Sequence, residues 1–251
     1  MAGRLIILSG PSCVGKSPLS AALGRFYPEI KASLRPLVLY NDRGPRPGEK
    51  DGVDYYFRTR QHIESLKSDS KYIVLDVRGD LQALDMEELK ELLQQGDVFF
   101  EGNPFVGSIL LEQAQIHGIS QLNMFMAPIS REEIIFLKNT DSNIELPDLV
   151  TDIMRRKLLR RTRKQKSELS LKDLENIEKR ASSAYKELGM AYQFKYVIPN
   201  HDGEDSENWD AFYYPLGDAL KSLQSFVSLY RNENAEYVET WEKDLLPYIS
   251  Y

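Results

Sequence analysis

Residues 5–17 read Leu-Ile-Ile-Leu-Ser-Gly-Pro-Ser-Cys-Val-Gly-Lys-Ser, and this stretch decides the fold. The apolar run at 5–8 is typical of a buried parallel strand, and the sequence that follows the stretch predicts a helix over 19–26. Between them lie Gly10, four further residues and then Gly15-Lys16-Ser17, which is the pattern of a phosphate-binding loop. A chance glycine-rich turn is the alternative, but the flanking strand and helix are the context that the motif requires.

The loop has the chemistry of a polyphosphate site. Small residues let successive backbone N–H groups turn inward around phosphates, and the positive N-terminus of the following helix adds to their effect. Lys16 is the candidate catalytic cation against the β- and γ-phosphates, and the Ser17 hydroxyl is a candidate ligand of Mg²⁺. Cys13, the only cysteine, is interpreted as a small loop residue, because no activating base is identifiable beside it. The predicted phosphate cradle consists of Gly10, Pro11, Ser12, Cys13, Val14, Gly15, Lys16 and Ser17.

Length and composition are those of an ordinary globular protein. The chain has 251 residues, of which 42% are hydrophobic and 28% charged, so one large domain is expected. No run of about 18 apolar residues is present and the first strand begins at once, so neither a membrane span nor a signal peptide is expected. The lone cysteine suits a reducing compartment, which predicts a cytoplasmic location. The formal net charge of −6 argues against a nucleic-acid partner.

A second motif lies in residues 41–57, after a short apolar run at 37–40 that predicts another strand. Its density of Pro and Gly indicates a loop. Arg43 and Arg46 lie three residues apart in this loop and are followed by a tyrosine pair that begins at Tyr55. Guanidinium forks and a phenol hydroxyl are suited to holding an anion, so the loop is a second candidate phosphate site.

Taken together, the two loops resemble those of guanylate kinases. The first reads Gly10-Pro-Ser-Cys-Val-Gly-Lys-Ser17, and the second begins Arg43-Gly-Pro-Arg-Pro-Gly-Glu and ends in a Tyr-Tyr-Phe run, at the family's distance from the first. The resemblance implies that Arg43, Arg46 and Tyr55 bind the phosphate of GMP. It also places Asn200, which follows a Val-Ile-Pro run, beside the adenine of ATP.

The resemblance is weaker between residues 72 and 126, a range that includes the segment by which guanylate kinases recognise the base. Guanylate kinases have a glutamate there whose carboxylate accepts hydrogen bonds from guanine. The corresponding stretch here, Tyr72 to Asp80, has no glutamate at the expected spacing. Asp76 is the candidate replacement, with Asp80 as the other candidate. Loss of the buried carboxylate is expected to relax the choice of base.

An acidic residue follows near the end of the next predicted strand. A helix is predicted over 85–95 and a strand over 97–103, which contains Glu101. By the resemblance, Glu101 is a candidate carboxylate beside Mg²⁺ or the acceptor substrate. A solvent-facing strand end is the equal alternative. A helix over 110–117 and a strand over 122–126 are expected to continue the core.

A strongly basic run at 155–166 contains eight Lys or Arg among twelve residues. A solvated helix face and a nucleic-acid patch are both consistent with such a run, although no aromatic residues are interleaved. The segment 175–188 resembles the helix after the lid of guanylate kinases, which assigns Arg180 to the transferring phosphates and Arg160 or Arg161 to the lid. Arginines that a closing lid delivers stabilise the transferring phosphoryl group and exclude water.

These observations predict a single α/β domain of the phosphate-binding-loop class, in which a parallel sheet lies between two layers of helices. The predicted core comprises residues 1–36, 95–137 and 183–230. Residues 37–94 form the predicted acceptor-binding insertion, and residues 138–182 form the predicted lid. Residues 231–251 extend past the usual end of the family and are expected to pack on the core or on a second subunit, which would make a homodimer.

The expected activity is ATP-dependent phosphorylation of a nucleoside monophosphate, GMP or dGMP first, with ATP and Mg²⁺ as cofactors. A kinase for another monophosphate or for a sugar phosphate is the first alternative, because the base-reading glutamate is absent. A catalytically silent guanylate-kinase-like binding module is the second alternative. Such modules typically lose the phosphate-binding loop, which is intact here.

Overall fold

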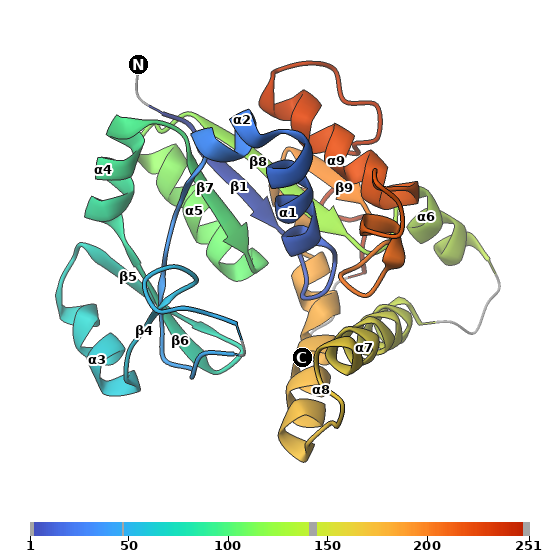
Figure 1. Ribbon diagram of the computed structural model, residues 1–251, viewed down its shortest axis with the longest axis horizontal. Helices are drawn as coiled ribbons and strands as arrows, with labels where there is room; N and C mark the ends of the chain where they lie inside the picture. Colours follow the sequence, from blue (N-terminus) through green and yellow to red (C-terminus); the bar gives the residue numbers. More distant parts are fainter. Residues whose placement is uncertain (1–2, 47, 141–144, 248–251) are drawn as a thin grey trace.

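The computed structural model describes residues 3–46, 48–140 and 145–247 (Figure 1). Its main sheet has five parallel strands in the order β2-β7-β1-β8-β9. The strands are β1 (Leu5–Ser9), β2 (Arg35–Pro36), β7 (Val98–Gly102), β8 (Gln121–Ala127) and β9 (Tyr196–Pro199). The expected parallel α/β sheet is therefore confirmed.

Helices cover both faces of the main sheet. Successive residues of β1 point to opposite faces, so Leu5 and Ile7 join one buried cluster while Ile6 and Leu8 join the other. The second cluster is covered by α1 (Lys16–Phe26), α2 (Pro28–Ser33) and α9 (Gly217–Tyr230). The first is covered by α4 (Met86–Gln95), α5 (Pro104–Ile116), α6 (Arg131–Asn139), α7 (Leu146–Gln165) and α8 (Leu171–Leu188).

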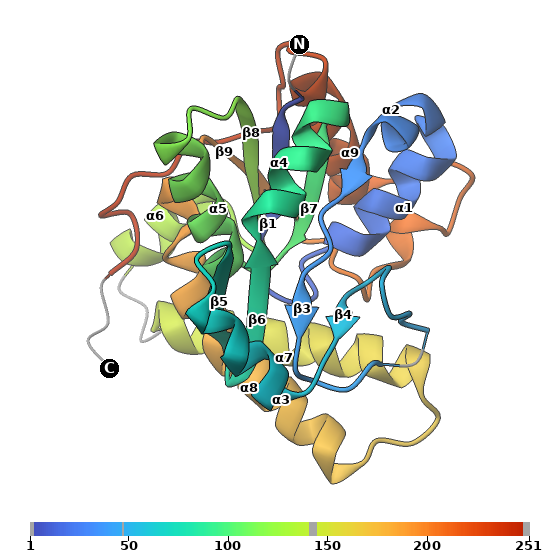
Figure 2. The same ribbon diagram turned by 90° about the vertical axis from the view of Figure 1, so that its left-hand side faces the viewer.

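A second, smaller sheet has the strand order β4-β3-β6-β5, and we call it the small sheet (Figure 2). Its strands are β3 (Tyr40–Asn41), β4 (Tyr56–Phe57), β5 (Tyr72–Val77) and β6 (Asp80–Asp85). The helix α3 (Arg60–Ser65) packs on one face of this sheet through the buried side chain of Ile63. The small sheet stands beside the carboxyl end of the main sheet, where the phosphate-binding loop lies.

Three elements differ from the sequence-based expectation. Of the run expected as a strand at 37–40, only Tyr40 lies in a strand, because residues 37–39 form the buried connection between the two sheets. The strand β6 was not expected, since polar residues at its ends and at Gln82 interrupt the apolar alternation. The helix expected over 110–117 begins earlier, at Pro104, because Asn103 caps it by accepting from the Val106 N–H.

The helices α7 and α8 pack against each other and lie opposite the small sheet (Figure 1). The ion pair between Arg155 Nε and Glu178 Oε2, 2.7 Å apart, joins them. Residues 141–144, which belong to the predicted lid, lie outside the described residues. At 20 residues α7 is the longest helix of the described ranges, and none of their helices is long and apolar enough to cross a membrane.

The C-terminal segment packs on the core, which is one of the two positions expected for it. Glu239 and Val197 exchange backbone hydrogen bonds of 2.8 and 2.7 Å, so the segment covers the outer edge of β9. Trp241 and Leu245 are buried in the same cluster as α8. The hydroxyl of Tyr185 on α8 donates to the carbonyl of Pro247 at 3.0 Å. Residues 248–251 lie outside the described residues.

Candidate functional site

The phosphate-binding loop connects β1 to α1 and has an unusual backbone. Its residues Gly10, Cys13 and Gly15 all have positive φ, of 152°, 68° and 106°. A side chain at Gly10 would come within 2.5 Å of the Met126 carbonyl oxygen, so glycine is required there by space as well as by conformation. The fully buried Asn200 amide donates to the Val14 carbonyl at 2.7 Å and so holds the loop from β9.

Two side chains of the loop have unusual surroundings. Lys16 is buried, and its ammonium group donates to the carbonyls of Gly10 and Pro11, both at 2.8 Å, so it is held over its own loop. Burial lowers the pKa of Lys16, and the carboxylates of nearby residues act in the opposite direction. Burial raises the pKa of the Cys13 thiol to about 12, which makes a thiolate nucleophile at neutral pH unfavourable.

Ser17 and Glu101 form a pair of hard oxygen donors at the mouth of the loop. The Ser17 hydroxyl donates to Glu101 Oε1 at 2.8 Å. Burial raises the pKa of Glu101, although Ser17 and Lys16 both lower it. The sequence left open whether Glu101 belongs to the acceptor side or the metal side, and the structure places it beside Ser17.

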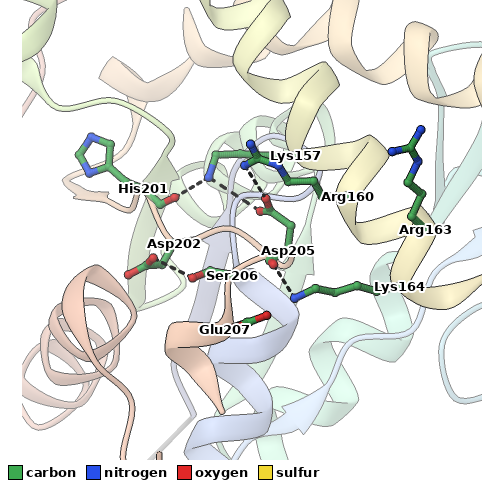
Figure 3. Close-up of a pocket in the computed structure, with 9 residues that line it drawn as sticks. All are labelled: Lys157, Arg160, Arg163, Lys164, His201, Asp202, Asp205, Ser206 and Glu207. Carbon is green, nitrogen blue, oxygen red and sulfur yellow. Dashed lines mark hydrogen bonds and ion pairs between the residues drawn. The ribbon is translucent and has the colours of Figure 1, made fainter. Parts of the chain in front are cut away.

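A cavity of about 590 Å³ lies between α7 and the segment that follows β9 (Figure 3). Its charged lining comes from α7 on one side and from the acidic segment on the other: Lys157, Arg160, Arg163, Lys164, His201, Asp202, Asp205 and Glu207. Lys157 donates to the His201 carbonyl, and Arg160 Nη1 lies 3.6 Å from Asp205 Oδ2. Asn200, at the end of β9, directly precedes this segment, so the cavity adjoins the phosphate-binding loop.

Of the two candidate lid arginines, Arg161 points inward and Arg160 is largely exposed. Arg161 Nη1 donates to Glu204 Oε2 at 2.8 Å, and only 16% of its side chain is accessible, against 67% for Arg160. Glu204 also acts on Lys16 electrostatically, so Arg161 reaches the region of the phosphate-binding loop while Arg160 lines the cavity.

The arginine loop, residues 43–57, carries its own carboxylate. Both prongs of the Arg43 guanidinium donate to Glu49, at 2.6 and 2.7 Å, and the same carboxylate accepts from the Arg46 N–H at 2.7 Å. Burial would lower the pKa of Arg43, but Glu49 outweighs it and the pKa is raised. Arg43 also lies over the ring of Tyr55, 5.1 Å from its centre. The loop is therefore held in shape by contacts that the sequence motif did not reveal.

Among the residues that the structure describes, none accepts a hydrogen bond from the Arg46 guanidinium or the Tyr55 hydroxyl. The nearest carboxylate to the Arg46 side chain is Glu49, at 3.9 Å, which is an ion pair without a hydrogen bond. Burial and then the charge of Arg43 lower the pKa of Arg46. Burial raises the pKa of Tyr55, so its phenol stays protonated and can donate.

Arg180 shows most clearly that cations converge here. It lies on α8, and within the described ranges no carboxylate forms an ion pair with it. Burial, and after it the charges of Arg46, Arg161, Arg78 and Arg43, together lower the pKa of Arg180 to about 9. The arginines of the loop, of α7 and of α8 therefore repel one another across a common space, which is the arrangement of an anion site.

Asp76 is not brought into this cluster. It lies opposite Leu81 in the β5–β6 ladder, and Leu81 packs toward α3 with Ile63, so Asp76 is on the face that α3 covers. Its carboxylate accepts from the Gly79 N–H at 2.5 Å and closes the hairpin turn. The other candidate, Asp80, lies on the opposite face, 3.8 Å from Lys179 of α8.

Two buried amides on the small sheet were missed by the sequence reasoning. Asn41 and Gln82 are 1% and 5% exposed and lie opposite each other on β3 and β6. Asn41 accepts from the Arg43 N–H at 3.1 Å, whereas the Gln82 amide has no hydrogen-bond partner among the described residues. The Gln82 amide keeps access to solvent and is therefore available to a bound ligand or to water. A polar residue at a buried strand position would have been the signal, had β6 been recognised.

Known proteins resemble this chain over most of its length. The family model for guanylate kinase matches residues 2–101. A guanylate kinase of Synechococcus sp. (strain JA-3-3Ab) is 32% identical over 221 residues, which are 85% of this chain and 83% of that protein. A guanylate kinase of Listeria monocytogenes serotype 4b (strain F2365) is 30% identical over 200 residues, which are 79% of this chain and 80% of that protein.

A solved structure shares the fold. The crystal structure of guanylate kinase from Anaplasma phagocytophilum superposes with a TM-score of 0.54 at 18% identity. The superposition covers 92% of this chain and 86% of that chain, so most of the fold has a counterpart there.

Proposed function

The chain belongs to the guanylate kinase family, and from this premise we propose that it transfers the γ-phosphoryl group of ATP to GMP or dGMP. It is a nucleoside monophosphate kinase. The observation that supports the proposal best is the convergence on one space of Lys16, Arg46, Arg161 and Arg180, the last of which has no carboxylate partner in the described part of the chain. Such a set of cations suits the phosphates of a donor and an acceptor held close together.

In the proposed mechanism, the protein positions the two substrates and neutralises their charge. The loop N–H groups and Lys16 hold the β- and γ-phosphates of ATP, and the adenine side lies toward Asn200. Arg43, Arg46 and Tyr55 hold the acceptor phosphate, and we add Asn41 and Gln82 as hydrogen-bonding contacts to the acceptor. Arg180, with Arg160 or Arg161, stabilises the phosphoryl group in transfer.

Mg²⁺ fits the oxygen donors beside the loop. Mg²⁺ in such sites is held by one or two protein oxygens together with substrate phosphates. The Ser17 hydroxyl and the Glu101 carboxylate, 2.8 Å apart, are donors of this kind, and we propose that Ser17 binds the ion while Glu101 orients Ser17 or a bound water. When bound, Mg²⁺ would neutralise charge on the β- and γ-phosphates.

We further propose that residues 37–94 are the acceptor-binding insertion and residues 138–182 the lid. Support comes from the arginine loop in the first segment and from the inward-facing Arg161 and Arg180 in the second. Several basic residues of α7 have carboxylate partners within the chain: Arg155 pairs with Glu178, and Arg161 with Glu204. A surface already neutralised in this way is poorly suited to tracking a nucleic-acid backbone.

A steady-state assay tests the activity. ATP consumption would be measured with GMP, dGMP, AMP, CMP and UMP as acceptors, at saturating ATP and Mg²⁺. We expect turnover with GMP and dGMP at the highest kcat/KM of the panel. Absence of turnover with every acceptor, or a clear preference for another base, would refute the proposal.

The acceptor ligands can be separated from the ATP ligands by kinetics. Arg46→Ala should raise the KM for GMP and lower kcat/KM at least about tenfold, because a hydrogen bond to a charged group contributes roughly 1.5–3 kcal/mol. Tyr55→Phe should lower kcat/KM for GMP about threefold to tenfold, since it removes one neutral hydrogen-bond donor. The KM for ATP should change less in both variants.

Arg58→Ala is the matched control for the arginine loop. Arg58 lies at the end of the loop and pairs with Asp51 at 2.9 Å, so its removal should leave both KM values unchanged. If Arg46→Ala weakens ATP binding and leaves the GMP KM unchanged, the assignment of this loop to the acceptor is wrong.

The basic run 155–166 is expected to respond to nucleotides. Hydrogen exchange of this segment should slow when ATP and GMP are both bound, because closure over them orders α7. Oligonucleotides should have little effect on exchange and should show no tight binding. Tight, salt-sensitive oligonucleotide binding that is lost on neutralising Arg160, Arg161 and Arg163 would contradict the lid assignment.

A further inference from the structure

The two-residue loop that joins β5 to β6 reaches across to α8 (Figure 2). Val77 and Asp80 are the last pair of the hairpin, so Arg78 and Gly79 form its tip. The Arg78 side chain meets Glu187 near the carboxyl end of α8, with Nε and Nη2 at 2.6 and 2.5 Å from the same oxygen, Oε1. This contact joins the small sheet to the helix that carries Arg180.

The contact is buried on both sides. The Glu187 side chain is 0% exposed and that of Arg78 is 14% exposed. The second oxygen of Glu187, Oε2, is buried and has no hydrogen-bond partner within the described part of the chain. A buried carboxylate that depends on one partner is a strong constraint, because separating the two would leave an uncompensated charge away from water.

The backbone at the tip is one that arginine seldom adopts. Arg78 and Gly79 have φ values of 58° and 86°. Two-residue hairpin loops with positive φ at both positions favour Asn, Asp or Gly at the first position. The conformation of the turn therefore does not favour arginine at position 78. The contact of this side chain with Glu187 is the feature that accounts for an arginine there.

The tip is also connected to the arginine loop. The Gly79 carbonyl accepts from Arg60 at 3.1 Å, and the same Arg60 nitrogen donates to Asp42 at 2.9 Å. Asp42 in turn accepts from the Leu81 N–H at 2.8 Å and directly precedes Arg43. Hydrogen bonds, joined through the Arg78–Gly79 backbone, thus connect Glu187 on α8 to the residue beside the first acceptor arginine.

We propose that Arg78 is a positioning residue, which through Glu187 fixes the acceptor-binding side of the protein relative to Arg180. The proposal rests on the kinase function proposed above. Arg78 acts by holding the two sides in a fixed relative position. When the contact is made, the acceptor phosphate at Arg43 and Arg46 is aligned with the phosphoryl group at Arg180. A misplacement of about 1 Å can cost on the order of 100-fold in rate.

The test is a double-mutant cycle on Arg78→Met and Glu187→Gln, with kcat, both KM values and the direct affinities for ATP and GMP measured for each variant. Arg78→Met should lower kcat by about 100-fold while the two nucleotide affinities change less than about threefold. Glu187→Gln keeps the shape of the side chain and one acceptor oxygen, so kcat should fall less than in Arg78→Met. The double variant should be no slower than Arg78→Met, because the two side chains act as a unit.

Two further variants keep the outcome decisive. Lys179→Met removes the other ion pair between the same tip and α8, a 3.8 Å contact to Asp80, and should leave kcat unchanged. Arg78→Lys keeps the positive charge but replaces the guanidinium fork with a single ammonium group. Its kcat should therefore lie between those of wild type and Arg78→Met. Equal kcat in wild type and Arg78→Met, multiplying losses in the double variant, or a loss confined to GMP affinity would each overturn the proposal. Wild type without GMP kinase activity would instead refute the function on which it rests.

Discussion

Replacement of Lys16 by Met is expected to abolish phosphoryl transfer and to leave the fold intact. The ammonium group faces the space where the cations converge, and the loop carbonyls of Gly10 and Pro11 are its hydrogen-bond partners. Removing a charge that stabilises the transferring phosphoryl group should lower kcat/KM by about a thousandfold or more. Met retains the apolar stem that packs in the loop, so the free energy of unfolding should change little.

Lys138→Met is the control for this experiment. Lys138 also donates to a backbone carbonyl, that of Leu245 at 3.1 Å, but it lies on α6 outside the site. Its loss should leave turnover unchanged. Steady-state rates and thermal melting of both variants would be compared with wild type, and a Lys16→Met protein that keeps more than a tenth of the wild-type turnover would count against the assigned role.

The phosphate-binding loop could be predicted because its information is local. A buried strand, Gly10, Gly15-Lys16-Ser17 and a helix follow one another within a short stretch, and each element requires the next. The parallel sheet follows from the same stretch, and the comparisons confirm the family that the two loops indicated. Positions assigned through the motifs, such as Arg46 and Arg180, are brought together in the structure.

The small sheet could not be predicted in the same way, because its pairings are not local. The strand β6 pairs with both β5 and β3, and the β3 partner of Gln82, Asn41, is far away in the sequence. Asp76 was predicted through the resemblance, as a replacement for the glutamate that is absent at the expected spacing. A one-residue difference in register decides which face of a strand a side chain occupies. The Arg78–Glu187 contact spans 109 positions and leaves no pattern in the sequence.

Arg180→Met is expected to change activity and stability in opposite directions. Without bound anions, Arg180 lies among other arginines, and its lowered pKa means that the charged form is disfavoured in the folded protein. Neutralising it should therefore stabilise the protein without bound nucleotides by about 1 kcal/mol, which corresponds to a rise in Tm of about 2–4 °C. The expected value is modest because Arg180 is only partly buried, so solvent screens part of its charge. The same change should lower kcat by about 10³-fold or more, since an arginine at the transferring phosphoryl group contributes that much.

Melting temperatures in a buffer free of phosphate and sulfate, together with kcat for ATP and GMP, would measure both effects. Arg131→Met is the comparison variant, because Arg131 already has a carboxylate partner, Glu242, at 2.8 and 3.0 Å. It should show no rise in Tm and no loss of turnover. Addition of ATP and GMP should raise the Tm of wild type more than that of Arg180→Met, because bound phosphates relieve the repulsion only where the charge is present. A variant that loses stability and activity together would show that Arg180 supports the fold, and a variant that keeps its turnover would remove Arg180 from the site.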